Sequence, residues 1–421
     1  MNSGSAARRM DNSAHELAFS SAQTPGVVTT LHPLTVLIVV PTLQAGAAEM
    51  GAVDLVRILT SAGHRAIVIS RGGRLEPRVA ATGAELIYAD VASKNPAIMV
   101  RNAAIISRIV RSRKCDIIHV HGRAPAWSAL VASKLTRVPF VTSWYKGFRE
   151  QNSLKRLYNS VMARGDRIFT VSDQLAEMIS ERYRVPSSRI DVVPTSVDLA
   201  LFDPALMSPD RLEETRRIFG VTASDKVILV VGRMLRRKGH HVALQAARRL
   251  KDMGLKDFAF VFVGENGGGS RYAGEIWDQV LANDLTDVIR LIGPVDDMPA
   301  AYAAASVVVS AAIQAEGLQR MILEAQAMER PVVVSDLGAG PDAVLAPPIV
   351  SEDRMTGLRF SAGDDSALAA ALIRLFSMPV AQQAAIGLRG RHWVIEHFSQ
   401  PAVSDLTLRL YSGLARGKTS A

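Results

Sequence analysis

Two glutamates separated by seven residues, Glu316 and Glu324, are the clearest candidates for binding chemistry in this sequence. Apolar residues recur at helical spacing from Leu318 to Met328, so Glu324 is predicted on a helix and Glu316 just before its start. At about 1.5 Å of rise per residue, the two carboxylates would lie roughly 10 Å apart. That separation suits two polyhydroxylated rings joined by a diphosphate, whose phosphates the free amides at the helix start would bind. The pair alone is more typical of solvated helix charges, so the interpretation depends on other residues.

Two cations at another expected helix start strengthen the prediction of a phosphate site. Arg233 and Lys238 flank a loop between the apolar run 227–231 and a helix expected to begin near Gly239. Cations are unfavourable at the positive end of a helix unless an anion joins them. The planar guanidinium of Arg233 and the compact ammonium of Lys238 both suit phosphate oxygens as hydrogen-bond acceptors. This loop therefore predicts diphosphate binding.

A histidine pair supplies a candidate for the reacting end of such a ligand. His119 and His121 belong to the expected strand 116–121, and alternate residues of a strand point to the same side. His121 falls at the carboxyl end, where open α/β sheets bind ligands, whereas a lone histidine is more often structural. After the expected strand 138–143, Lys146 and Arg149 either meet an acceptor phosphate or are ordinary surface charges.

These residues need a scaffold of alternating strands and helices. Short apolar runs at 34–40, 66–70, 227–231 and 258–263 are typical of buried parallel strands, and amphipathic segments separate them. The 421 residues suffice for two domains, each with its own core. The sequence therefore predicts an α/β protein with two domains.

Six motifs in order resemble the family-4 retaining glycosyltransferases, a branch of the group 1 glycosyltransferases, over roughly residues 34–412. The motifs are Gly46-Ala-Ala-Glu49, His119-Val-His-Gly122, Val171-Ser172, Pro194-Thr-Ser-Val-Asp198, Gly232-Arg-Met-Leu-Arg-Arg-Lys-Gly239, and Glu316 to Glu324. No single motif is specific, but their order is. The resemblance implies the GT-B fold, in which two Rossmann-like domains face each other across a cleft.

The resemblance also implies roles for individual residues. His121 and Glu316 would be catalytic, with His121 at the reacting face and Glu316 on the sugar hydroxyls. The donor-binding residues would be Gly46, Arg233, Lys238, Gly317, Leu318 and Glu324, with Glu324 on the ribose. Lys146 and Arg149 are the candidates for acceptor binding. The resemblance implies no metal, no cofactor and no enzymic nucleophile, because in this family the donor phosphate itself is thought to deprotonate the acceptor.

The sequence departs from the family pattern at three positions. Thr195 and Ser196 replace an asparagine and a glycine in an interdomain segment, and Gln319 replaces a glycine between the two glutamates. If backbone amides bind the sugar there, Gln319 changes that contact and with it the sugar that the protein prefers.

The expected domains are a disordered N-terminus (1–30), an N-terminal acceptor domain (31–200), a C-terminal donor domain (201–395) and a helix returning to the first domain (396–421). No apolar run approaches the length of a membrane span, and the N-terminus lacks a hydrophobic signal core. The single cysteine, Cys115, agrees with a reducing compartment. A cytoplasmic location is therefore expected.

The net charge is concentrated in the first half of the chain. Residues 31–200 carry 23 Lys and Arg against 13 Asp and Glu, a balance of +10, whereas residues 201–421 carry 24 against 25. Two basic amphipathic helices, expected at 97–114 and 153–164, have charged faces that are either simply solvated or suited to anionic lipid headgroups. Nucleic acid is disfavoured as a partner because aromatic residues do not interleave the basic stretches.

The sequence thus predicts a retaining hexosyltransferase. Its donor would be a nucleoside diphosphate sugar, and its acceptor a lipid-linked glycan, lipopolysaccharide or polysaccharide of the cell envelope, with possible peripheral contact to an anionic membrane. Two alternatives stay open: a GT-B-fold sugar-nucleotide epimerase, and a catalytically inactive module that binds a membrane surface or nucleic acid.

Overall fold

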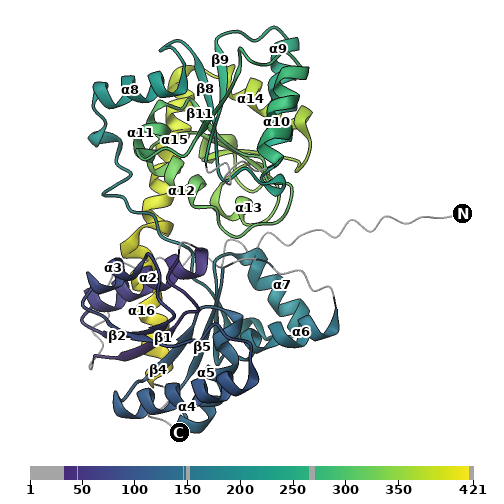
Figure 1. The fold of residues 1–421 in the computed structure, drawn as a ribbon. Coiled ribbons are helices and arrows are strands. Elements are labelled where there is room, and N and C mark those ends of the chain that lie inside the picture. Colours follow the sequence, from purple (N-terminus) through teal and green to yellow (C-terminus); the bar gives the residue numbers. More distant parts are fainter. Residues whose placement is uncertain (1–32, 45, 146, 148–151, 265–270, 417–421) are drawn as a thin grey trace, which may run out of the picture. The chain divides into compact units, whose positions relative to one another are not determined.

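Short apolar strands from the two halves of the chain form two parallel sheets (Figure 1). The computed structural model describes residues 33–44, 46–145, 147, 152–264 and 271–416. The expected disordered N-terminus, Lys146 and Arg149 lie outside these residues. Within them, one sheet has seven strands and the other six, which confirms the predicted α/β class with two Rossmann-like sheets.

The first domain is defined here by β1 to β7 and the helices between them. Its elements are β1 (Thr35–Val39), α2 (Ala47–Ser61), β2 (Arg65–Ser70), α3 (Glu76–Ala80), β3 (Glu85–Tyr88), α4 (Pro96–Ser112), β4 (Ile117–Val120), α5 (Arg123–Thr136), β5 (Phe140–Trp144), α6 (Ser153–Ser160), η1 (Val161–Arg164), β6 (Arg167–Thr170), α7 (Asp173–Tyr183), η2 (Ser187–Arg189) and β7 (Ile190–Val192). The basic segment expected as one helix over 153–164 is α6 followed by the 3₁₀ turn η1.

The second domain is defined by β8 to β13 and their helices. Its elements are η3 (Pro204–Leu206), α8 (Pro209–Phe219), β8 (Lys226–Val231), η4 (Arg236–Lys238), α9 (His240–Asp252), β9 (Phe258–Val263), α10 (Arg271–Ala282), β10 (Ile289–Gly293), α11 (Met298–Ala304), β11 (Val307–Ser310), α12 (Arg320–Ala327), β12 (Val332–Ser335), α13 (Gly340–Ala343), η5 (Glu352–Arg354), β13 (Gly357–Phe360), α14 (Asp365–Phe376) and α15 (Val380–Phe398). The last helix described, α16, covers Gln400–Arg416.

Each sheet is buried on both faces, which explains why its strands read as continuous apolar runs. In β1, Val36 and Ile38 pack into one core while Leu37 and Val39 pack into another on the opposite face. The residues of β8 divide between two cores in the same way. Period-two alternation therefore places helices on both sides of each sheet.

Strand order fixes where ligands can bind. The sheets have the orders β3-β2-β1-β4-β5-β6-β7 and β10-β9-β8-β11-β12-β13, so the direction of winding reverses between β1 and β4 and between β8 and β11. Open α/β sheets bind ligands beyond the carboxyl ends of the strands at such reversals. The Gly46 loop follows β1, His121 follows β4, Lys238 follows β8, and Glu316 follows β11.

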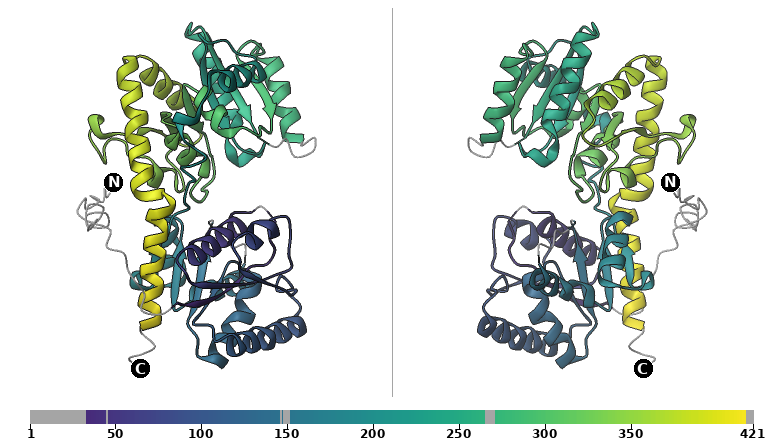
Figure 2. Two further views of the ribbon diagram at one scale, coloured as in Figure 1. Left: turned by 90° about the vertical axis from the view of Figure 1, so that its left-hand side faces the viewer. Right: turned by 90° about the vertical axis from the view of Figure 1, so that its right-hand side faces the viewer.

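The C-terminal helix packs on the first domain (Figure 2). Tyr411 of α16 is fully buried in the core that contains Val36 and Ile38 of β1. Just before α16, Ser399 pairs with Val197 in an isolated parallel bridge, and Val197 donates to the carbonyl of Phe398 over 2.9 Å. α15 runs to Phe398, past the boundary expected at 395.

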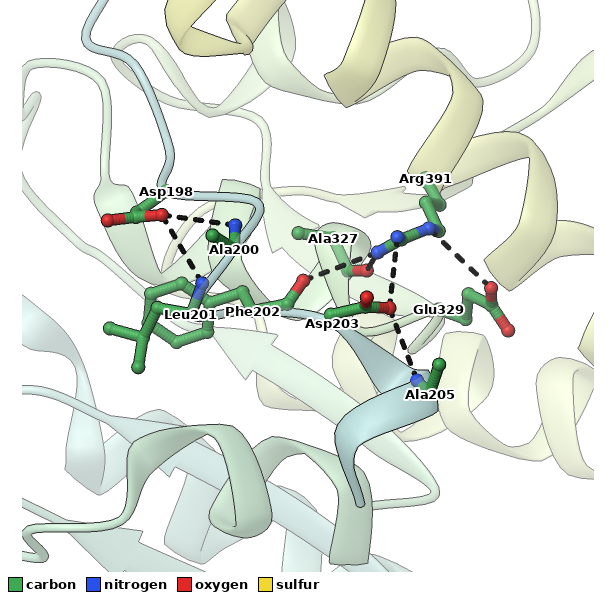
Figure 3. Close-up of polar contacts among 9 residues, drawn as sticks. All are labelled: Asp198, Ala200, Leu201, Phe202, Asp203, Ala205, Ala327, Glu329 and Arg391. Carbon is green, nitrogen blue, oxygen red and sulfur yellow. Dashed lines mark hydrogen bonds and ion pairs between the residues drawn. The ribbon is translucent and has the colours of Figure 1, made fainter.

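An arginine of α15 holds the interdomain segment (Figure 3). Arg391 donates to the carbonyls of Ala327 and Phe202, the latter over 3.3 Å, and to Asp203 Oδ1 over 3.2 Å. Its Nε lies 3.8 Å from a carboxylate oxygen of Glu329. The side chain is 18% exposed, so these partners largely replace water. Arg391 therefore fastens the segment around Phe202 to α15 and to the end of α12.

The single cysteine of the sequence is buried. Cys115 is 4% exposed, and burial raises the pKa of its thiol to about 11.

In the described part of the chain, no single helix has both the length and the apolar composition of a membrane span. The pair α14 and α15 meets those criteria together, with a bend of 111° between its helices.

Candidate active site

The centre of the second-domain site is an acid held by two cations. The Glu316 carboxylate accepts a hydrogen bond from Arg237 Nε at 2.7 Å and another from Lys238 Nζ. The Glu316 and Lys238 side chains are only 14% and 18% exposed, so solvent screens this pair much less than a surface ion pair. The structure therefore brings the predicted residues Glu316 and Lys238 into direct contact.

A glycine allows the two loops to approach this closely. Gly239 follows η4 with a φ of 71°, and a Cβ there would lie 1.7 Å from the carbonyl oxygen of Ala311. The loop after β8 can thus rest against the loop after β11 only with glycine at this position. This contact carries Lys238 to Glu316.

Gln319 occupies the space beside Lys238 instead of facing open solvent. Its side-chain oxygen accepts from Ser310 Oγ at 3.0 Å and lies 3.4 Å from Lys238 Nζ. The helix predicted from Leu318 begins at Arg320, with Gln319 as its N-cap residue. The correction follows from packing, because Leu318 contacts the cores of both domains and belongs to the loop. No side chain caps α12, so its first amides are available to an anion.

Arg237, which was not among the predicted residues, is the arginine that contacts Glu316. Arg233 is exposed and has no ion pair among the described residues, whereas Arg236 turns away to pair with Glu275. The 3₁₀ turn η4 determines that Arg237 points toward Glu316 and Arg236 away from it. Three adjacent cations in the sequence give no periodic signal that would show which of them faces the acid. The structure places Arg233 at the start of this loop, after Gly232, while Lys238 ends it.

Glu324 lies apart from this cluster. Its carboxylate accepts from the Tyr302 hydroxyl at 2.7 Å, and burial raises the pKa of this carboxyl. Glu324 and Arg320 line a cavity of about 760 Å³ together with residues of α2 and of the segment 196–202. Within the described ranges, that lining includes neither Glu316 nor Lys238. The structure thus does not join the two glutamates in one contact.

His121 and His119 share one side of β4, as the strand alternation predicted. Their ring centroids lie 4.6 Å apart. His121 Nδ1 is 2.9 Å from the Tyr145 hydroxyl, and burial lowers the pKa of His121 to about 3. His119 contacts Ser143 and Tyr411, and its pKa is held well below the usual range by burial. Both rings are therefore neutral at physiological pH.

The loop of Gly317 meets the first domain at Tyr145. A Cβ at Gly317 would lie 2.3 Å from the carbonyl oxygen of Tyr145, so these two backbones touch. Leu318 packs with first-domain core residues. The structure therefore places Glu316 one residue from a contact with Tyr145, whose hydroxyl bonds His121. The predicted Gly46 is the N-cap of α2, beyond β1 of the same sheet.

Sequence reasoning missed four side chains that shape this region: Tyr145, Tyr302, Arg237 and Asp54. Asp54 of α2 pairs with Arg320 at 2.6 Å and lines a cavity of about 50 Å³ with His121 and Tyr145. Only tertiary packing assigns Tyr145 to His121 and Tyr302 to Glu324. No group of three or more His, Cys, Asp or Glu in the described residues could hold a metal ion.

Two protein-family models match successive parts of the chain. Glycosyltransferase Family 4 matches residues 48–201, and Glycosyl transferases group 1 matches residues 225–378. The first match covers most of the domain that contains His121. The second covers the loops that contain Lys238, Glu316 and Glu324.

Individual proteins show the same similarity. A D-inositol 3-phosphate glycosyltransferase of Nocardiopsis dassonvillei is 27% identical over 63% of this chain and 63% of its own length. A UDP-Gal:alpha-D-GlcNAc-diphosphoundecaprenol alpha-1,3-galactosyltransferase of Escherichia coli is 28% identical over 55% of this chain and 60% of its own length. The matches span about three fifths of these curated relatives. The crystal structure of a glycosyltransferase from Rickettsia africae superimposes with a TM-score of 0.82 at 27% identity, covering 91% of this chain and 99% of that one.

Proposed function

Because this chain belongs to the group 1 glycosyltransferases, we propose that it transfers a hexose from a nucleoside diphosphate sugar to a cell-envelope acceptor. The observation that carries the proposal is the contact of Glu316 with Lys238 and Arg237 beyond β8 and β11. Two cations around one carboxylate leave a net positive charge at a sheet position suited to ligands. A diphosphate is the anion that this charge and the uncapped start of α12 would bind.

Donor binding would rearrange the ion pairs at Glu316. The phosphate oxygens compete with the carboxylate for Lys238 and Arg237, since both anions accept charge-assisted hydrogen bonds. Each cation drawn to the phosphates frees a Glu316 oxygen, which can then accept from a sugar hydroxyl. The ion pair thus keeps the charges of the unliganded site satisfied while holding the cations near the phosphate position.

The same cations would assist bond cleavage. When the bond between the sugar and the diphosphate breaks, negative charge builds on the leaving phosphate. Lys238 and Arg237 are already placed by Glu316 and Gly239, so little reorganisation is needed to stabilise that charge. The proposal assigns no nucleophilic side chain, and the reaction would retain the anomeric configuration.

Other predicted residues take roles in orientation. His121 would contact the reacting sugar from the first domain, and its neutral ring is consistent with a hydrogen-bonding role. Glu324 would accept from the ribose hydroxyls; its buried position and its bond to Tyr302 hold the carboxylate in one orientation. Arg233 would add a third cation to the diphosphate.

The donor nucleoside is proposed to be uridine, on the strength of the similar E. coli enzyme, which is named for UDP-galactose. That relative is also named for a diphosphoundecaprenol acceptor. A lipid-linked acceptor agrees with the balance of +10 over residues 31–200 of this chain. We therefore propose that the enzyme works on the cytoplasmic face of an anionic membrane.

The proposal is tested in two steps. Saturation-transfer NMR against UDP-, GDP- and ADP-sugars identifies the donor, and we expect a UDP-hexose to bind. The donor is then incubated with short-chain diphospholipid-linked GlcNAc, and the anomeric configuration of the product is read by NMR. Product with the donor's own configuration supports the proposal. Release of free sugar or an epimerised donor without transfer would instead indicate the epimerase alternative, and binding of no nucleotide would indicate an inactive module.

A further inference from the structure

Tyr145, which directly follows β5, contacts the candidate catalytic histidine in two ways. Its hydroxyl lies 2.9 Å from His121 Nδ1. The two rings also stack, with centroids 5.6 Å apart and an angle of 23° between their planes. A directional hydrogen bond at one ring atom and a contact along the ring face together restrict the orientation of the His121 side chain.

A glycine of α2 makes room for the Tyr145 ring. A Cβ at Gly51 would lie 2.3 Å from the Tyr145 hydroxyl oxygen and 2.4 Å from the ring carbon that bears it. Gly51 is inside α2, where glycine is less favourable than alanine. The close approach of the ring accounts for a residue that helix propensity disfavours. The far end of the Tyr145 side chain is thus fixed against α2.

The backbone of Tyr145 is fixed by the loop that carries Glu316. A Cβ at Gly317 would lie 2.3 Å from the carbonyl oxygen of Tyr145, so the two backbones are in contact. Leu318, the next residue of the loop, packs against the same first-domain core as Tyr145. Tyr145 is therefore held at its backbone by the second-domain loop and at its hydroxyl end by α2 and His121.

The second ring nitrogen of His121 gives this restraint a chemical consequence. The His121 side chain is 1% exposed, and Tyr145 occupies its Nδ1. Its Nε2 is also buried and makes no hydrogen bond among the described residues. Buried polar atoms of folded proteins nearly always have a partner, so an unpaired one is a candidate contact for a ligand. Because Nδ1 is fixed by Tyr145, the placement of Nε2 depends on Tyr145.

We propose that Tyr145 is a positioning residue for sugar transfer: it orients His121 through Nδ1, so that Nε2 is the ring nitrogen that meets the substrate. Gly51 supports this role by admitting the Tyr145 ring. The part of this inference that concerns the substrate rests on the proposed function. Since Tyr145 also touches Gly317, one residue links the orientation of His121 to the loop of Glu316.

Two substitutions in the full-length protein test the proposal. Tyr145→Phe keeps a ring against Gly51 and removes the hydroxyl, whereas Gly51→Ala keeps the hydroxyl and displaces the ring. Histidine-ring NMR reads the surroundings of His121 without substrate, with its signals assigned by His121→Gln. We expect both variants to shift the His121 signals. Transfer should slow roughly fivefold to tenfold in each, the scale of one lost hydrogen bond, with nucleotide affinity unchanged. Because both changes act on one contact, the double variant should be little slower than Tyr145→Phe alone.

Matched controls separate this role from general effects on the fold. Tyr88→Phe removes an exposed first-domain hydroxyl that bonds Glu76, and Gly274→Ala adds a methyl group to α10 where nothing lies within 4 Å. Neither control should change the His121 signals or the transfer rate.

Unchanged His121 signals in Tyr145→Phe overturn the proposal. Wild-type transfer by that variant, or fully additive losses in the double variant, would overturn the link from Tyr145 to the reaction. The NMR signals are read without substrate, so they still decide whether Tyr145 orients His121 if the wild type transfers no sugar. Failure of the proposed transferase activity is therefore a separate outcome.

Discussion

Arg320 at the start of α12 and Asp54 on α2 form an ion pair of 2.6 Å between the second and first domains. Asp54 also pairs with Arg57 at 3.3 Å, and its side chain is 16% exposed. The contact lies three residues after Gly317, where the backbones of the two domains already touch. It therefore reinforces the junction at which Gly317 meets Tyr145.

This ion pair should contribute little to stability. Arg320 is 38% exposed, so solvent screening reduces the coupling to about 0.5 kcal/mol. A double-mutant cycle of Arg320→Ala and Asp54→Ala, followed by thermal unfolding at low and high salt, measures it. We expect the coupling to fall as salt rises. A salt-independent coupling above about 2 kcal/mol would show that the pair behaves as a buried one.

Removing Lys238 should weaken nucleotide binding. Lys238→Ala deletes one charge-assisted contact to the diphosphate, so affinity for a nucleoside diphosphate should fall by roughly 1.5 to 3 kcal/mol. Calorimetry checks this, with Arg248→Ala on the exposed face of α9 as a matched loss of charge. Equal affinity for wild type and folded Lys238→Ala would remove the donor site from this loop.

Binding and transfer should separate between the two domains. Glu324→Ala should reduce affinity for free nucleotide, and Tyr302→Phe should do so more weakly because it removes only the bond that orients Glu324. His121→Ala should retain nucleotide affinity and lose sugar transfer. Nucleotide titration and a transfer assay on each variant test the assignment. A His121→Ala protein that loses nucleotide affinity, beside a Glu324→Ala protein that keeps it, would reverse it.

Stability should depend on pH through Asp342. Burial raises the pKa of this carboxyl to about 6, against the partial opposition of N–H groups of Gln174 and Asp173. The folded state thus favours the protonated form of Asp342. The contribution of Asp342 to the stability of the fold is therefore largest below about pH 4, the pKa of this carboxyl in the unfolded chain. That contribution is lost as pH rises to 6. Asp342→Asn should therefore stabilise the protein by about 2 to 3 kcal/mol at pH 7.5, with no gain at pH 4.

Thermal unfolding across this pH range measures the effect of Asp342. Asp278→Asn, an exposed substitution of the same kind, serves as control. A gain from Asp342→Asn that is equal at pH 4 and pH 7.5 would contradict the prediction.

The first domain should bind anionic vesicles through α4 and α6. Leu154 and Leu157 of α6 are 76% and 56% exposed, beside Lys155. The exposed Arg101 and Arg108 lie on α4, whereas Arg113 is already paired with Glu85 at 2.8 Å and is a poor choice for mutation. Each cation near such a surface is worth about 1 kcal/mol and is screened by salt.

Sedimentation with anionic liposomes measures this binding. Binding should decrease with salt, and both Arg101→Glu with Arg108→Glu and Leu154→Ser with Leu157→Ser should weaken it. Met253→Ser, an exposed apolar loss in the second domain, should not. Equal binding to neutral vesicles, or binding to neither kind, would favour a soluble acceptor.

The strands were predictable because both of their faces are apolar, and the shared side of His119 and His121 follows from strand alternation alone. The proximity of Lys238 and Glu316 was predictable only through the motif order, since the two lie 78 residues apart. The contact of Arg237 with Glu316 could not be predicted, because a 3₁₀ turn decides which of three adjacent cations faces the acid. Tyr145, Tyr302 and Tyr411 could not be found, because their hydroxyls acquire partners only when distant segments pack.

The buried Cys115 has a practical consequence for measuring how this protein moves. It is the only cysteine in the sequence, and it is both inaccessible and un-ionised at neutral pH. Thiol-reactive dyes require an exposed thiolate, so the native residue should resist labelling without being replaced. A pair of engineered surface cysteines, one on α4 and one on α9, would then carry fluorophores in an otherwise unmodified enzyme, and single-molecule energy transfer would follow the separation of its domains during turnover.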